Sequence, residues 1–287
     1  MANIRLISRR IKGVRNIAKI TRAMEMVAAL RMKKAQERGL AGRPYSEKIT
    51  EVIASLAALP QAGEILHPLL ERREVKKVAV VHITPDRGLA GGLVGNINRR
   101  TIGLIDEQKV PVTMVTVGRK GLDAMRRYGQ DIRAEFTRLG DAPGLIDTLP
   151  ISRIIIDDFS NGLVDVVYLA YSRFVSTAVQ RAEIVQLLPV EPAEMPASQN
   201  VEYIYEPSAA AVLDGLLTRF VEMRIYHGIL ESIASEQSAR MVAMRNATDN
   251  ANELIIDLTL AYNKARQESI TTELLDITGG AAALTQT

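Results

Sequence analysis

Two residue types are missing from the 287-residue sequence, which contains neither cysteine nor tryptophan. Without cysteine the chain cannot form a disulfide framework, a thiolate zinc site, an iron–sulfur cluster or a cysteine nucleophile. Aromatic residues make up only 4%, which disfavours sites that recognise bases or sugars by stacking. With 47% hydrophobic and 24% charged residues, the chain can bury a sizeable core in one or two domains.

Long hydrophobic runs are also lacking. Arginine and lysine interrupt the amino-terminal residues, which leaves no apolar stretch of the length found in a signal peptide. No run approaches the roughly 18 apolar residues of a membrane span. We therefore expect no targeting segment and a chain that associates with a membrane only through partners.

Proline and glycine are unevenly distributed. All eleven prolines lie between Pro44 and Pro207, and neither residue type occurs between Gly228 and Gly279. Both ends are therefore predicted to be long uninterrupted helices. In the carboxyl-terminal stretch, mostly apolar residues recur at alternating spacings of three and four, which is coiled-coil periodicity. These positions are Leu213, Leu216, Phe220, Met223, His227, Leu230, Ala234, Gln237, Met241, Met244, Thr248, Ala251, Ile255, Leu258, Tyr262 and Ala265.

The amino-terminal arm has the same periodicity and a strong positive charge. Its stripe is Ile4, Ile7, Ile11, Val14, Ala18 and Thr21, and a flanking row of Ile17, Ile20, Met24 and Val27 is expected to widen the buried surface. Residues 1–40 carry a net charge of +9, whereas residues 208–287 carry −4. We expect the two arms to pair as an antiparallel coiled coil, held mainly by apolar burial and assisted by this charge difference.

Between the arms the pattern changes to that of an α/β domain. Short β-branched runs, typical of strands covered on both faces of a parallel sheet, occupy 78–83, 112–117 and 164–169. Helical patterns lie between or before them at 93–107, 119–128 and 149–160. This alternation predicts a doubly wound, Rossmann-like α/β domain. The predicted organisation is therefore a coiled-coil helix over 1–58, the α/β domain over 75–190 and a second coiled-coil helix over 208–287.

A glycine-rich segment, DRGLAGGLVG at 86–95, follows the first predicted strand. In dinucleotide-binding folds this turn holds a pyrophosphate at a helix amino terminus. The glycine spacing differs from G-x-G-x-x-G, and Gly118 with Arg119 and Lys120 follows the second strand where an acidic residue would hold a ribose. Because glycines also allow a tight turn, the structural role is favoured, and a nucleotide-dependent enzyme is the alternative.

Other candidate catalytic or metal-binding residues are isolated in the sequence. Asp86 and the pair at 157–158 have no neighbouring histidine and are expected to be solvated or to cap helices. His67, His82 and His227 show no ligand spacing, so we expect no metal site and no cofactor. His227 falls on a core position of the predicted coiled coil, where a polar residue more often sets the register.

The basic amino-terminal arm is also compatible with binding to nucleic acid. Clusters at 9–12 and 31–34 could contact phosphates. However, the same helix has an apolar stripe for a partner helix, and an acidic arm is present in the same chain. We therefore expect no binding to nucleic acid.

The last residues form an apolar tip that would extend beyond the partner helix. The tip contains Ile270, Leu274, Leu275, Ile277 and the run at 281–284. Exposed apolar surface of this kind usually marks an interface. Alternatively, the tip folds back at Gly279 and Gly280.

Four segments give the chain a family resemblance that covers its whole length. They are ITRAMEMVAA at 20–29, DRGLAGGL at 86–93, SEQSARMVAM at 235–244, and YNKARQ at 262–267 followed by ITTE at 270–273 and Gly280-Ala281. With these segments the chain resembles the γ subunit of F-type ATP synthases, of the bacterial type. Ala90 stands where many relatives have cysteine, and the dithiol insertion of the plant plastid form is absent, so redox switching is not expected.

The resemblance implies a noncatalytic rotor. In this family the coiled coil stands inside a ring of α and β subunits, and the base rests with the ε subunit on the ring of c subunits. The expected function is to couple proton flow through the membrane sector to ATP synthesis or hydrolysis at the β subunits, and to regulate ATPase activity. The expected location is the cytoplasmic face of the bacterial plasma membrane, as a peripheral subunit.

The resemblance also implies positions for the partner contacts. Contacts with the β subunits are expected at Arg266, Gln267, Thr271 and Glu273, with Met24 packed close to that region. Contacts with the c ring are expected at Tyr203, Tyr205 and Glu206.

Overall fold

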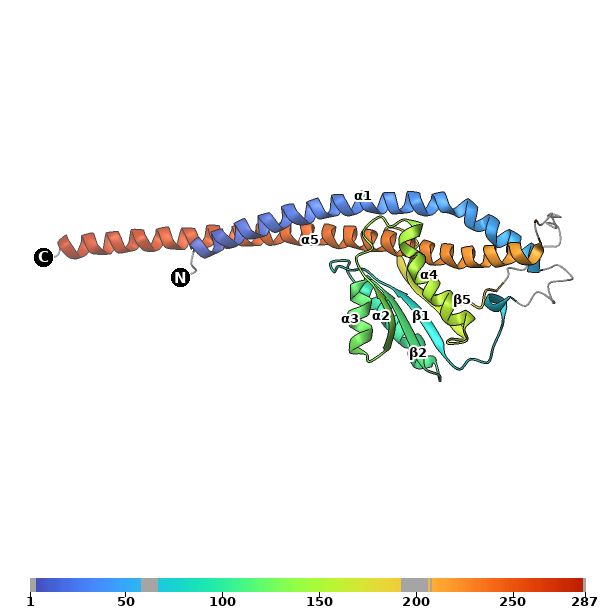
Figure 1. Cartoon of the computed structure of the whole chain (residues 1–287). Helices are drawn as coiled ribbons and strands as arrows, with labels where there is room; N and C mark the ends of the chain where they lie inside the picture. The colour runs from blue at the N-terminus through green and yellow to red at the C-terminus, as the bar shows by residue number, and fades with distance from the viewer. Residues whose placement is uncertain (1–3, 58–66, 192–205, 207, 286–287) are drawn as a thin grey trace. The chain divides into compact units, whose positions relative to one another are not determined.

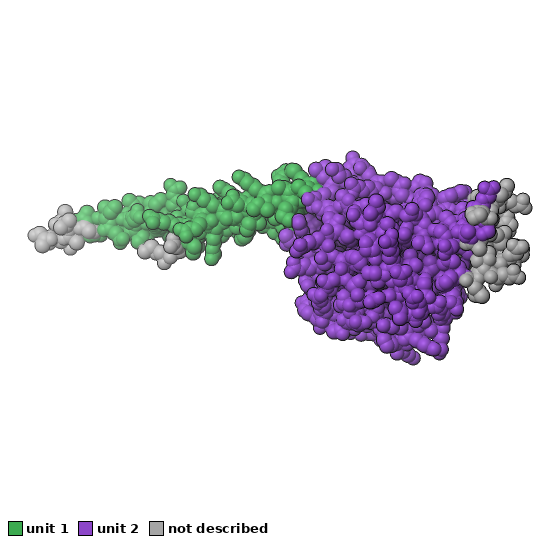
Figure 2. All heavy atoms as spheres, in the orientation of Figure 1, with its two compact units in different colours: residues 1–27, 241–287 green, residues 28–240 purple. Residues whose placement is uncertain are grey.

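The computed structural model describes residues 4–57, 67–191, 206 and 208–285 (Figure 1). Two long helices begin and end the described chain, α1 over Ile4–Ala57 and α5 over Ala209–Thr285. The chain divides into two compact units (Figure 2): residues 1–27 with 241–287, and residues 28–240. Each long helix contributes to both units.

The unit 28–240 is built on a five-stranded sheet in the order β3-β2-β1-β4-β5. The strands are β1 (Val78–Ile83), β2 (Val112–Val117), β3 (Asp131–Phe136), β4 (Val166–Phe174) and β5 (Gln180–Leu188). The first four are parallel, and β5 pairs antiparallel with β4. Every residue of β1 is buried, as expected of a central parallel strand with helices on both faces.

Helices cover both faces of this sheet, which confirms the doubly wound fold. Helices α2 (Leu93–Glu107) and α3 (Arg119–Arg127) pack on one face, where Ile97 and Met125 meet Val80 and Met114. Helix α4 (Leu145–Ser160) packs on the other, with Phe159 fully buried. A short 3-10 helix, η2 (Pro68–Leu70), precedes β1.

Several element boundaries agree with the sequence predictions. Strands β1 and β2 and helix α2 have the predicted bounds. The third predicted strand begins at Val166 rather than residue 164 and extends to Phe174. Helix α4 begins at Leu145, four residues before the predicted start, because the Asp147 carboxylate accepts a hydrogen bond from the Gly144 amide at 2.8 Å and caps an extra turn.

Two strands were not predicted, β3 and β5. Strand β3 is an edge strand in which exposed charged residues alternate with half-buried apolar ones. Its sequence, DIRAEF, lacks the continuous apolar run of a buried parallel strand. Strand β5 is held by its pairing with β4, a contact that local sequence does not reveal.

In this unit, parts of α1 and α5 cover the same face of the sheet as α4. Ile49 and Ile53 of α1 join Leu217 and Val221 of α5 in the core cluster that contains β1 and β4. Helix α5 also approaches the sheet closely at Gly228, where a Cβ atom would lie 3.0 Å from Leu169 Cδ2. The absence of a side chain at Gly228 therefore allows the close packing of this helix on β4.

The unit formed by 1–27 and 241–287 consists of the remaining turns of α1 and α5. The Thr21 and Thr248 hydroxyls are 2.7 Å apart, and Arg245 Nε donates to Glu25 Oε1 at 2.8 Å. A step forward along α1 thus corresponds to a step backward along α5, and the pairing is antiparallel, as predicted. In both units together, each of the sixteen predicted stripe positions of α5 is buried or half-buried.

The flanking row predicted on α1 is not buried. Ile17, Ile20 and Val27 are 54%, 59% and 48% exposed, and only Met24 of this row is half-buried. One partner helix covers only a narrow stripe of α1, and the flanking row lies to the side of that stripe. These residues therefore add to the exposed apolar surface of this unit.

The charge difference between the arms does not form the expected ion pairs in this unit. The ion pair between α1 and α5 has its acid on α1, Glu25, and its base on α5, Arg245. Among the described residues, no ion pair involves the basic side chains of α1 between residues 4 and 22. The pairing of the helices therefore depends on apolar burial, and this row of cations faces solvent.

Candidate interaction surfaces

The carboxyl-terminal end of α5, called here the tip (residues 266–285), exposes apolar side chains at its described positions. Of the predicted apolar run at 281–284, Ala281 is exposed and the side chains at 282–284 lie outside the described residues. Among the described side chains of α5, Ala265 is the last buried one. Beyond it, Ile270 is 46%, Leu274 57% and Ile277 67% exposed. Helix α5 continues through Gly279 and Gly280 to Thr285, so the alternative in which the tip folds back at these glycines is wrong. An apolar surface of this extent is typical of an interface.

The four residues predicted to contact a partner from α5 lie together on the tip. Arg266, Gln267, Thr271 and Glu273 are all exposed. Thr271 donates its hydroxyl to the Gln267 carbonyl at 2.9 Å, a bond within one turn of the helix. The charged and amide groups are thus presented to solvent beside the apolar residues, and they remain predictions as partner contacts.

Met24 does not lie beside these four residues. Its neighbour Glu25 pairs with Arg245, which places Met24 opposite the part of α5 near residue 245. Arg266 lies about 30 Å further along the helix at 1.5 Å per residue. The expected packing of Met24 close to the tip is therefore wrong, because the antiparallel register brings another part of α5 to it.

The second predicted group of partner contacts lies mostly outside the described residues. Tyr203 and Tyr205 fall in the segment 192–205, which the structure does not describe. Glu206 is described and is exposed. Its role as a contact stays a prediction.

The glycine-rich loop packs against α5 in the unit 28–240. Arg240 donates to the Gly88 carbonyl at 3.1 Å, and Ala90 is buried against Leu93 and Ala239. Leu89 has φ of +65° with its side chain 64% exposed. The loop that would hold a pyrophosphate in a dinucleotide fold thus contacts a helix of the same chain, in agreement with the structural role favoured from sequence.

Asp86 fixes the neighbouring turns. Its two carboxylate oxygens accept hydrogen bonds from the Arg119 and Arg138 amides, both at 2.9 Å. This confirms the expected capping role, since Arg119 begins α3. Asp158 was expected to be solvated or capping, but it is buried and receives two hydrogen bonds from Arg133, at 3.0 and 3.1 Å. Its burial follows from the position of α4 against β3.

The histidines have separate structural contacts. His82 is fully buried, and its ring nitrogens lie 2.8 Å from Asn98 Oδ1 and 3.1 Å from Thr101 Oγ1. Burial lowers the pKa of His82 to about 4. His67 lies 2.9 Å from an Asp214 oxygen. Across the described ranges, no group of three or more histidine and acidic residues could hold a metal ion.

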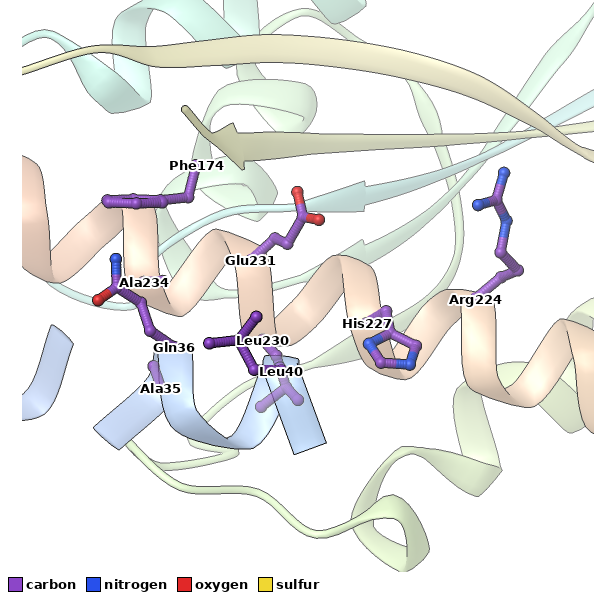
Figure 3. Close-up of a pocket in the computed structure, with 10 residues that line it drawn as sticks. Ala35, Gln36, Leu40, Phe174, Arg224, His227, Leu230, Glu231 and Ala234 are labelled. Carbon is purple, nitrogen blue, oxygen red and sulfur yellow. The ribbon is translucent and has the colours of Figure 1, made fainter. Parts of the chain in front are cut away.

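A cavity of about 500 Å³ lies between α1 and α5 beside the end of β4 (Figure 3). Its apolar lining includes Leu40, Phe174 and Leu230, and Arg224 and Glu231 extend from α5 along one side. Beside the cavity, His227 lies opposite Gly42, where a Cβ atom would be 2.7 Å from the imidazole Cε1. His227 thus sits at the helix interface, as its core position predicted.

Sequence reasoning missed the polar contacts of α5 between Ser232 and Arg240. Their signal was present as three serines spaced by three residues, Ser232, Ser235 and Ser238, within a mainly apolar helix. All three are buried, and their hydrogen-bond partners lie on the sheet or just beyond its strands.

In the described part of the chain, no helix is both long and apolar enough to span a membrane.

Comparisons with known proteins agree with the resemblance seen in the sequence. A family model described as ATP synthase matches residues 3–284. The ATP synthase gamma chain of Dehalococcoides mccartyi strain 195 is 74% identical over 284 residues, covering 99% of this chain and all of the relative. That of Chloroflexus aurantiacus strain J-10-fl is 51% identical over 289 residues, with 99% and 100% coverage.

Solved structures share the fold at lower sequence identity. A chain of the Euglena gracilis mitochondrial ATP synthase rotor has a TM-score of 0.65 at 19% identity, covering 93% of this chain and 98% of that one. A chain of the Tetrahymena thermophila mitochondrial central stalk and c ring has a TM-score of 0.61 at 23% identity, covering 79% and 99%. The full-length family match and the high identity to its members show that this chain belongs to the ATP synthase gamma chain family.

Proposed function

We propose that this protein is the central-stalk rotor of a proton-translocating F-type ATP synthase. The observation that carries the proposal is the tip of α5, which continues as helix past the last buried position with its apolar side chains exposed. A helix end of this kind requires an external apolar surface. In the gamma chain family, to which this chain belongs, the collar of α and β subunits would provide that surface.

The mechanism is differential binding driven by rotation. A rotor whose sides differ presents a different face to each of the three β subunits. Each β site is then driven through states of different nucleotide affinity, because contacts with the rotor stabilise one state over another. In this mechanism catalysis belongs to β, and this chain has no catalytic site of its own but regulates the rate at which the complex turns over.

The partners follow from the same assignment. The structural neighbours belong to the central stalk with c ring and to the rotor of ATP synthases, which supports a c ring at the base. An ε subunit beside it is assigned by family resemblance alone. We place the protein on the cytoplasmic face of a bacterial plasma membrane, attached through these partners. The coiled-coil helices at 1–58 and 208–287 and the α/β domain at 75–190 would form the shaft and the base.

The individual contacts are assigned by family resemblance and by exposure. Arg266, Gln267, Thr271 and Glu273 present polar groups from the tip, suited to hydrogen bonds with loops of β. Met24, Tyr203, Tyr205 and Glu206 are assigned by resemblance alone, the first to β and the others to the c ring.

The test is assembly followed by direct observation of rotation. The chain is expressed with tagged β and the remaining subunits, purified through the tag, and labelled at an introduced cysteine. This is the only cysteine of the chain, whose sequence contains none. Co-purification and stepwise rotation of a bead during ATP hydrolysis are expected. Failure to co-purify, or ATP hydrolysis without rotation, contradicts the proposal. A saturable thermal shift of the isolated chain with NAD, NADP or ATP would instead favour an enzyme.

A further inference from the structure

Helix α5 completes the hydrogen bonding of β4 where β1 ends. The ladder between β1 and β4 stops at the pair His82 and Ala170, whereas β4 continues along β5 to Phe174. Beyond Ala170, the Ser172 amide donates to Ser232 Oγ at 3.2 Å, and Ser235 Oγ donates to the Ser172 carbonyl at 2.9 Å. Two serines of a helix thus satisfy the backbone groups that a neighbouring strand would otherwise bond.

Helix α5 makes further hydrogen bonds in its carboxyl-terminal direction. Ser238 Oγ donates to the Thr177 carbonyl at 2.8 Å, beyond the end of β4. Arg240 donates to the Gly88 carbonyl in the loop after β1, and a 2.7 Å ion pair with Glu236 holds its guanidinium. The polar seam, defined as Ser232, Ser235, Ser238 and Arg240, therefore bonds two separate parts of the carboxyl edge of the sheet. All four residues are buried, with exposures between 0% and 9%.

The polar seam differs in kind from the attachment that precedes it along α5. From Leu213 to Ile229 the helix is held to the sheet by apolar side chains. Apolar burial depends on area and is largely non-directional, so it resists separation more than rotation or sliding. Hydrogen bonds require short distances and near-linear angles. Bonds made by α5 between Ser232 and Arg240, to partners on two separate parts of the sheet edge, therefore fix the rotation and the axial position of the helix.

The serines have costs as well as the gain of satisfying Ser172. Serine lowers helix propensity relative to alanine, and a buried hydroxyl must be desolvated before it bonds. Apolar residues of similar size would avoid these costs but would leave the Ser172 amide and carbonyl without these partners. What the serines add is a unique geometry, in which a small rotation of α5 would leave the buried backbone groups of Ser172 without partners.

We infer that the polar seam is the torque-bearing attachment between helix α5 and the α/β domain. The inference rests on the proposed function, in which torque generated along α5 must reach the base of the rotor. The apolar contacts hold the helix on the sheet, and the polar seam prevents it from turning or slipping there. Ser232, Ser235, Ser238 and Arg240 are positioning residues in this mechanism and contact no substrate.

The test compares two variants in the assembled complex, and the thermal unfolding of each isolated chain is measured alongside. The seam variant carries Ser232→Ala, Ser235→Ala and Ser238→Ala. The control carries Ile225→Val and Ile229→Val, which weaken the apolar contacts of the same helix but keep its hydrogen bonds. A gold rod is attached at Arg153→Cys on the exposed side of α4, rotation is stalled with a non-hydrolysable ATP analogue, and the angular variance of the rod is measured.

The seam variant is expected to increase the angular variance about twofold or more, because a directional restraint has been removed. The control is expected to match the wild type. Equal variance in all three proteins, or an equal increase in both variants, overturns the inference while leaving the proposed function intact. Absence of rotation in the wild-type complex contradicts the proposed function itself and removes the basis of the inference. If the triple variant does not assemble, Ser235→Ala alone is measured against the same criteria.

A second measurement uses the isolated chain and does not depend on rotation. Hydrogen exchange at the Ser172 amide reports directly on its bond to Ser232. In the seam variant this amide is expected to exchange about tenfold faster, with little change in the control. Unchanged exchange would show that the seam is not formed in solution and would overturn the inference.

Discussion

His227 occupies the space that a side chain at Gly42 would need. A Cβ on Gly42 would lie 2.7 Å from the imidazole Cε1 and 3.1 Å from Nε2. Both residues belong to the unit 28–240, where α1 and α5 pack on the same sheet. A large residue opposite the smallest one fixes which turns of the two helices face each other.

This pair predicts opposite outcomes for two nearby glycines of α1. A Cβ added at Gly39 would have no atom within 4 Å, so Gly39→Ala is expected to raise stability by about 0.5–1 kcal/mol through helix propensity. Gly42→Ala is expected to lower stability by roughly 1–3 kcal/mol, since the added methyl overpacks the interface. Urea unfolding of both variants checks this, and adding His227→Ala to Gly42→Ala should recover part of the loss. Equal effects at the two glycines would contradict the prediction.

The hydroxyl pair of Thr21 and Thr248 predicts a non-additive pair of substitutions. The two oxygens are 2.7 Å apart and buried, and each hydroxyl can also donate to a carbonyl of its own helix. Thr21→Val or Thr248→Val alone should cost about 0.5–1.5 kcal/mol, because one bond between the helices is lost. The double variant should cost less than the sum of the two, because no hydroxyl is then left without its partner. Strict additivity in thermal unfolding would show that the pair does not interact.

His82 predicts a dependence of stability on pH. Its pKa is lowered to about 4 in the folded chain, against 6.5 as the ordinary value, because the ring is fully buried. The unfolded chain therefore binds a proton that the folded chain does not, and stability falls as the pH drops from about 6.5 towards 4. The loss is on the order of 3 kcal/mol over this window.

The measurement is urea unfolding of the wild type and of His82→Gln at pH 7.5 and pH 5. The variant should show a smaller loss on acidification than the wild type. Burial raises the pKa of Glu236, so this residue makes stability depend on pH with the opposite sign. Because Glu236 is present in both proteins, the difference between them reports on His82. An identical loss in the two proteins would show that His82 is not the group responsible.

The tip predicts a defect in the assembled complex without a defect in the fold. Arg266 and Gln267 are exposed, so Arg266→Ala with Gln267→Ala should leave thermal unfolding of the isolated chain nearly unchanged. ATP turnover of the complex should fall, because charge-assisted hydrogen bonds to β are removed. Lys264→Ala with Glu268→Ala, also exposed, is a control for loss of charge in the same turns. Full turnover in an assembled double variant would count against these residues as contacts with the β subunits.

The coiled-coil pattern and the central sheet could be predicted because their signals are local. The three-four spacing from Leu213 to Ala265 gives the buried stripe of α5 directly, and β-branched runs give β1 and β2. The edge strand β3 could not be predicted, because half of its residues face solvent and its charged residues resemble a loop. The tip was predicted as exposed apolar surface because the apolar stripe of α5 continues beyond the length that the shorter helix α1 can cover.

The long-range contacts could not be predicted from the same patterns. The register that places Glu25 beside Arg245, rather than Met24 beside the tip, depends on packing along the whole helix pair. The exposure of Ile17, Ile20 and Val27 depends on the number of helices that pack against α1. Neither quantity is encoded in the spacing of one segment.

The sequence by itself determined the two long helices, the stripe by which they pair, the α/β alternation between them and the family to which the chain belongs. Each of these depends on periodicity or on short runs of residues. Only the tertiary structure decided how α5 meets the sheet, with Ser232 and Ser235 bonded to Ser172 and Arg240 bonded to Gly88. These partners are 60 to 152 residues apart, and such contacts arise only when the sheet and the helix have been brought together.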